Sequence, residues 1–174
     1  MAIDALAHSF KIRKFNHVRL SDWAAQEIVL CDAAEPVKII LVKPQTFMNS
    51  SGLAIAPLLK EHGVSLKDLI VIHDEMDLPV GYARVSFNAS SAGHRGVGSI
   101  VDACGGKGFA RIRVGIDKPQ RPDGVIDYVL SGFSKTEWAS FIEVIARVPA
   151  IVRTIICEGV MIAQDRFNRK VVQD

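Results

Sequence analysis

Apolar and polar positions follow two periods along this chain, one typical of short strands and one typical of helices. Alternating or continuous apolar runs predict strands at residues 24–30, 37–42, 69–72, 84–87 and 110–116. Apolar residues at helical spacing predict helices at residues 3–10, 53–62, 99–103, 134–148 and 150–157, and a last turn or short helix at 159–168. The order is that of a mixed α/β domain.

Local signals mark the ends of these elements. Gly63 stops one helix, Ser134 and Glu137 have the spacing of a capping box, and Pro149 ends or kinks the helix before it. Residues 93–98 are predicted to form a glycine-rich loop before a helix. No repeat or linker divides the chain, so we predict a single domain, residues 1–174, with a mixed, mainly parallel sheet flanked by helices.

Composition removes several classes of protein. Hydrophobic residues make up 49% of the 174 residues, which excludes a disordered chain. No apolar run is long enough to span a bilayer, and the start of the chain is not typical of a signal peptide. Three widely spaced cysteines favour ordinary thiols in a reducing compartment over a disulfide or a zinc site, so we expect a cytoplasmic protein, or an organellar one if a longer start precedes residue 1.

Basic residues are clustered although the net charge is only +2. The clusters are residues 11–19, residues 107–121 and residues 166–170. Such clusters can bind phosphate, and they can equally form a solvated surface.

Polar residues follow the predicted strand 69–72, where open α/β sheets bind their ligands. Three carboxylates within residues 73–77 repel one another, which is costly unless the arrangement has a use. Asp74 could orient a catalytic imidazole or keep a base charged, and a plain turn is the alternative. A metal site built from His73, Asp74 and His94 is a further alternative.

Two other segments carry candidate hydrogen-bond donors. The amide of Asn49 could stabilise an oxyanion, or it could cap the following helix. The loop from Gly93 to Gly96 combines backbone N–H groups with Arg95, which suits phosphate but equally suits a simple turn. Its glycine spacing is not that of a dinucleotide fingerprint.

Four segments together resemble the bacterial-type peptidyl-tRNA hydrolase family. Residues 43–52 (KPQTFMNSSG) are similar to its P-x-T-F-M-N-x-S-G segment, and residues 73–81 (HDEMDLPVG) to its H-D-E-L-D-L-P-x-G segment. Residues 93–96 (GHRG) resemble its G-H-N-G loop and residues 111–116 (RIRVGI) its R-L-R-I-G-I-G strand. The resemblance covers nearly the whole chain.

The resemblance implies hydrolysis of the ester between a peptide and the terminal ribose of tRNA, in a monomer that needs no cofactor and no metal. In the family a neutral histidine activates water and an aspartate, matching Asp74, supports it. An active-site amide matches Asn49, and Phe47 matches a residue that lines the substrate groove. We expect His94, Arg95 and Arg113 to bind substrate, with Asn49, Asp74 and His94 converging on one cleft.

The chain departs from the family pattern in three places. The family opens with a strand, an N-P-G turn and an R-H-N element, but residues 3–7 here match the helix that follows, so the general-base histidine and an active-site asparagine have no counterpart. Arg95 replaces an asparagine, and a guanidinium donates but cannot accept. Ser86 stands where a lysine often contacts tRNA phosphate.

The absent strand also bears on stability. Losing about five buried apolar side chains at ~2 kcal/mol each removes about 10 kcal/mol, which rivals the ~5–15 kcal/mol of a typical domain. We therefore expect a longer product, another segment in the gap, or a marginally stable chain. Two further hypotheses stay open: a catalytically inactive tRNA- or RNA-binding relative that keeps the groove, and a metal-dependent hydrolase.

Overall fold

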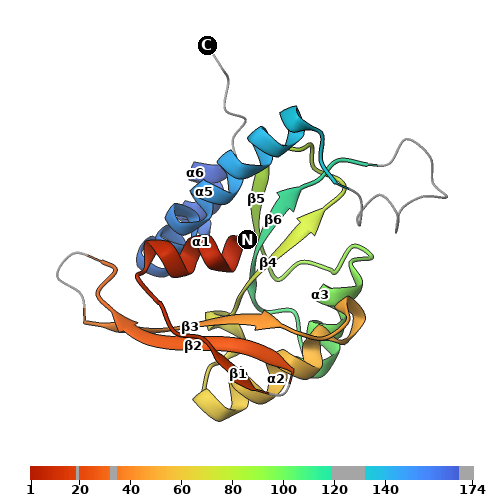
Figure 1. The fold of residues 1–174 in the computed structure, drawn as a ribbon. Coiled ribbons are helices and arrows are strands. Elements are labelled where there is room, and N and C mark those ends of the chain that lie inside the picture. Colours follow the sequence, from red (N-terminus) through yellow and green to blue (C-terminus); the bar gives the residue numbers. More distant parts are fainter. Residues whose placement is uncertain (19, 32–34, 119–131, 169–174) are drawn as a thin grey trace.

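The computed structural model describes residues 1–18, 20–31, 35–118 and 132–168, and in these residues helices cover both sides of the strands (Figure 1). The elements are α1 (Ala2–Ser9), β1 (Asn16–Val18), β2 (Ser21–Ile28), β3 (Val37–Pro44), the 3-10 helix η1 (Met48–Ser50), α2 (Ser51–His62), the 3-10 helix η2 (Leu66–Asp68), β4 (Ile70–Glu75), β5 (Ala83–Phe87), α3 (Arg95–Cys104), β6 (Ala110–Gly115), α5 (Lys135–Glu158) and α6 (Val160–Phe167).

The strands form two three-stranded sheets. The first has the order β1-β2-β3 and is antiparallel, and the second has the order β4-β6-β5 and is mixed. The predicted single-domain α/β fold with a mixed sheet is confirmed. The predicted predominance of parallel pairing is wrong: among the described strands only β4 and β6 pair in parallel, and the other pairs are antiparallel.

Strands β3 and β4 are edge strands of the two sheets. Among the described strands, β3 pairs only with β2 and β4 pairs only with β6. Both strands contribute to the same two hydrophobic clusters, so they belong to one layer between the same helices. Ile40 of β3 and Ile70, Val71 and Ile72 of β4 are only half buried, whereas Ile112 of the central strand β6 is fully buried. We call these two strand edges, one on β3 and one on β4 and each without a described strand partner, the β3–β4 gap.

One hydrophobic cluster lies on each side of this layer. The larger cluster packs α1, α5 and α6 against the strands, with Val148 and Ile151 of α5 almost fully buried. The smaller cluster lies under α2 and α3 and contains Ile55, Val97, Ile100 and Phe109. In Figure 1 the two helix groups accordingly lie on opposite sides of the strands.

Two predicted helix boundaries are wrong. Helix α3 begins at Arg95, four residues before the predicted start, because the His94 side chain caps it. Gly96 serves packing, since a Cβ there would lie 2.5 Å from Met48 Sδ. Helix α5 continues through Pro149, and its buried face on both sides of the proline stabilises it despite the lost N–H. The Ser134–Glu137 capping box and the stop at Gly63 are confirmed.

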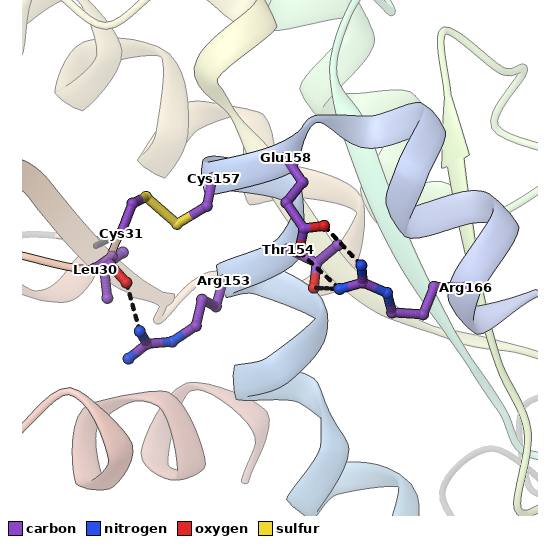
Figure 2. The surroundings of a disulfide bond; sticks show 7 residues. All are labelled: Leu30, Cys31, Arg153, Thr154, Cys157, Glu158 and Arg166. Carbon is purple, nitrogen blue, oxygen red and sulfur yellow. Dashed lines mark hydrogen bonds and ion pairs between the residues drawn. A yellow bond between two sulfur atoms is a disulfide. The ribbon is translucent and has the colours of Figure 1, made fainter. Parts of the chain in front are cut away.

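The expectation of ordinary thiols is wrong for two of the three cysteines. Cys31, in the connection from β2 to β3, forms a disulfide with Cys157 in the last turn of α5 (Figure 2). Arg153, one turn earlier on α5, donates to the Leu30 carbonyl beside the disulfide. The bond spans 126 residues of sequence, so spacing could not reveal it, and it ties the first sheet covalently to α5.

Membrane-spanning helices do not occur among the described residues: none of the helices there is both long and apolar enough to cross a bilayer.

Candidate active site

The segment after residue 72 is part of strand β4, which runs further than the predicted strand 69–72. His73, Asp74 and Glu75 are strand residues and not a turn, since β4 pairs with β6 through Glu75 opposite Gly115. A Cβ on Gly115 would lie 2.0 Å from the Pro79 carbonyl oxygen, so only glycine lets the chain that leaves β4 cross β6 this closely.

Asp74 and His94 form a hydrogen-bonded pair, with His94 Nε2 3.1 Å from Asp74 Oδ1. The Val97 backbone N–H donates to His94 Nδ1 at 3.1 Å. A neutral ring that accepts at Nδ1 carries its proton on Nε2, so His94 donates to Asp74. This hydrogen bond is the main reason that the pKa of Asp74 lies below its ordinary value of 3.8. Asp74 is therefore a carboxylate at neutral pH.

His73 lies against this pair in a buried position. Its Nδ1 is 2.6 Å from the carbonyl oxygen of Asp74, and its ring meets the His94 ring edge to face, with centroids 4.6 Å apart. Burial, followed by the nearness of His94, lowers the pKa of His73 from 6.5 to about 4. His73 is thus neutral at neutral pH.

The lowered pKa of His73 predicts that acid destabilises the fold. Below pH 6.5 the unfolded chain binds a proton that folded His73 does not bind until about pH 4. The free energy of unfolding therefore falls across this window, by about 3 kcal/mol at its acid end. Urea unfolding at pH 7 and pH 4.5 should show a smaller loss in His73→Phe, which cannot titrate, than in the parent chain. Equal losses in the two proteins would contradict this assignment.

The three carboxylates after β4 do not form one shared site. Asp74 bonds His94, Glu75 accepts from Arg113 Nε at 2.8 Å, and Asp77 pairs with Lys118 at 2.7 Å. Each negative charge has its own partner, so the expected repulsion is relieved. Within the described ranges, no three His, Cys, Asp or Glu side chains are arranged to hold a metal ion, and the metal-dependent alternative has no support there.

The η1 segment brings Asn49 near the same place. Met48 occupies the space beside Gly96, next to His94, and η1 packs on α3. The cap interpretation of Asn49 is wrong, because the N-cap of α2 is Ser50 and no side chain caps that helix. The Asn49 side chain is exposed, and among the described residues no hydrogen bond joins it to Asp74 or His94. Phe47 is 87% exposed beside it.

The two candidate cations are placed differently. Arg95 is exposed at the first position of α3, immediately after His94. Arg113 is about 20% exposed, and its Nε donates to Glu75.

Sequence reasoning missed the contact between His73 and His94 and the Glu75–Arg113 pair. His73 could be picked out from its position at the end of a strand. Its ring contact with His94 could not, because His94 is the N-cap of α3 and is placed by the start of that helix. Glu75 and Arg113 are 38 residues apart, and only the parallel pairing of β4 and β6 brings them together.

Together, the fold and the strand-end Asp–His pair define an α/β protein with a site suited to acid–base chemistry. The sequence model of a family described as peptidyl-tRNA hydrolase matches residues 1–174. Peptidyl-tRNA hydrolase of Limosilactobacillus reuteri is 38% identical over 81% of this chain and 73% of its own length, and that of Lactiplantibacillus plantarum is 41% identical over 81% and 72%. The chain belongs to the peptidyl-tRNA hydrolase family.

A solved structure agrees on the fold. Peptidyl-tRNA hydrolase from Acinetobacter baumannii superposes with a TM-score of 0.84 at 23% identity, covering 96% of this chain and 82% of its own. At this identity the likeness concerns the fold alone.

Proposed function

We propose that this protein hydrolyses the ester bond of peptidyl-tRNA, releasing peptide and free tRNA, with Asp74 orienting the histidine that activates water. Membership of the family supports the reaction. The observation that carries the role of Asp74 is its hydrogen bond with His94 at the end of β4. That bond uses Oδ1, and a carboxylate has a second oxygen, Oδ2, that can accept from another imidazole.

His94 is not the general base in this arrangement. Its Nε2–H donates to Asp74, and its Nδ1 lone pair accepts from Val97. Taking a proton from water at Nδ1 would break the cap of α3, and Nε2 has no free lone pair. His94 instead holds Asp74 and presents its ring to the substrate.

We further propose that the general base enters on a β-strand that occupies the β3–β4 gap. Within the described residues neither edge of the gap has a strand partner, and such edges pair readily with an added strand. The half-buried apolar side chains of β3 and β4 would become fully buried by this addition. The family's N-terminal strand, with its R-H-N element, is the proposed occupant, and its histidine would reach Asp74 Oδ2.

The substrate groups follow from the surrounding residues. The exposed amide of Asn49 would position the substrate carbonyl, and the exposed ring of Phe47 would contact the peptide. Arg95 and Arg113 would meet tRNA phosphates, so binding should depend on salt.

The proposed role of Arg113 predicts a change in salt dependence. Arg113→Gln removes one phosphate contact, so tRNA affinity should fall at low salt and the slope of log affinity against log salt should decrease by about 1. Fluorescence titration of tRNA at several salt concentrations measures this. Lys67→Gln, on η2, is a charge-matched control and should keep the parent slope. An unchanged slope in Arg113→Gln would contradict the assignment.

The hydrolytic role of Asp74 is tested by release of peptide from a purified N-acyl-aminoacyl-tRNA. The parent for this test carries the family strand and R-H-N element before residue 1. Asp74→Asn keeps the shape of the side chain but removes its charge, so turnover should fall by about a hundredfold, the lower end of the range for general-base catalysis. Asp68→Asn, a carboxylate on η2, should leave turnover unchanged. Parental turnover in Asp74→Asn would refute the proposed role, and tRNA binding without hydrolysis in the parent would favour the inactive RNA-binding alternative.

A further inference from the structure

His73 touches both members of the Asp74–His94 pair. It is 8% exposed, its Nδ1 lies 2.6 Å from the Asp74 carbonyl oxygen, and its ring centroid lies 4.6 Å from that of His94. Its imidazole is therefore bonded to the backbone of one member and packed on the side chain of the other.

The hydrogen bonds assign opposite tautomers to the two rings. A carbonyl oxygen only accepts, so His73 carries its proton on Nδ1 and donates it to Asp74. His94 accepts at Nδ1 and carries its proton on Nε2. His73 Nε2 is then a lone pair, and it is buried without a hydrogen-bond partner in the described part of the chain.

Packing alone does not account for an imidazole at this position. A buried acceptor without a partner is destabilising, and a phenylalanine ring would fill similar space without that penalty. The feature that phenylalanine lacks is the Nδ1–H donor. That donor holds the peptide unit of Asp74 at the end of β4, from which the carboxylate reaches His94.

We propose that His73 is a positioning residue of the hydrolytic site, which fixes Asp74 through the Nδ1–H bond to its carbonyl and fixes His94 through the edge-to-face ring contact. This inference rests on the proposed function for its catalytic consequence, but not for its geometry. A charged His73 would compete with His94 for the Asp74 carboxylate, so the role requires the neutral ring that burial enforces.

Two variants separate the donor from the ring. His73→Phe keeps a ring beside His94 and loses the donor, whereas His73→Asn places an amide nitrogen as many bonds from the backbone as Nδ1 and loses the ring. Both are compared with the parent by NMR, following the Asp74 carboxyl titration and the nitrogen shifts of the His94 ring. In His73→Phe the pKa of Asp74 should rise toward 3.8, and His73→Asn should restore part of the depression.

Kinetics on the strand-bearing chain provide the second measurement. His73→Phe should lower kcat about tenfold to a hundredfold with little change in KM, because a small misplacement affects the transition state more than binding. If the Asp74 titration and the His94 shifts match the parent in both variants, His73 is a core residue and the proposal is wrong. If these NMR signals change as expected while the parent hydrolyses no ester, His73 still positions Asp74 and His94, but the proposed function is wrong. Should His73→Phe not fold, His73→Asn alone decides: parental His94 shifts in it would overturn the proposal.

Discussion

Adding the family's N-terminal strand and R-H-N element before residue 1 is expected to raise peptidyl-tRNA hydrolysis by about 10²–10⁴-fold, the usual contribution of a general base. The reason lies in the bonding of His94: its Nε2–H donates to Asp74 and its Nδ1 accepts from Val97, so the proposed mechanism takes its base from the added segment. Release of peptide from purified N-acyl-aminoacyl-tRNA, under identical conditions for both proteins, measures the difference.

A control variant distinguishes the catalytic effect of the added histidine from the structural effect of the added strand. The same added segment with alanine in place of its histidine should close the β3–β4 gap and stabilise the fold without restoring turnover. Equal turnover by the chain with and without the segment, abolished by His94→Ala, would show that His94 changes tautomer and acts as the base. The assignment of His94 as a holding residue would then be wrong.

Reducing the Cys31–Cys157 disulfide is expected to lower the free energy of unfolding by about 5 kcal/mol. The chain-entropy model attributes this loss to the freedom that the unfolded chain regains when a long closed loop is opened. The loop here spans 126 residues, and the loss rivals the ~5–15 kcal/mol total of a typical domain. The double variant Cys31→Ser/Cys157→Ser should show the same loss in urea unfolding.

Cys104 provides the matched control for that experiment. It is half buried on α3 and not in a disulfide, so Cys104→Ser should keep the unfolding midpoint sensitive to reductant. Identical midpoints of the parent chain with and without reductant would show that the disulfide contributes nothing to stability.

Periodicity predicted the helices and strands well because most of them bury one face against a cluster. The capping box at Ser134 and the glycine stop at Gly63 are local signals and located their helix ends correctly. Boundaries failed where tertiary contacts decide them. Met48 packing on Gly96 allows α3 to begin early, and the buried face of α5 carries that helix through Pro149.

The candidate site was predictable in its residues but not in its bonds. A strand-end position identified Asp74, and the glycine-rich segment identified His94, yet nothing local shows that these two side chains meet. The pairing of Glu75 with Arg113 likewise depends on the register of β4 and β6, and the disulfide depends on where α5 ends relative to the β2–β3 connection. Contacts between segments that are far apart in the sequence depend on how the elements pack. The pattern of one sequence does not show that packing directly.

The edges of β3 and β4 that lack a described strand partner could also pair with other chains. An unpaired strand edge is a template for any extended chain, including the same strand of a second molecule, and such pairing propagates into aggregates. Lys38 on β3 adds an exposed positive charge that opposes self-pairing, whereas residues 70–72 of β4 are an uninterrupted apolar run. A strand paired with these two edges, as proposed above, would remove both of them as templates for self-association.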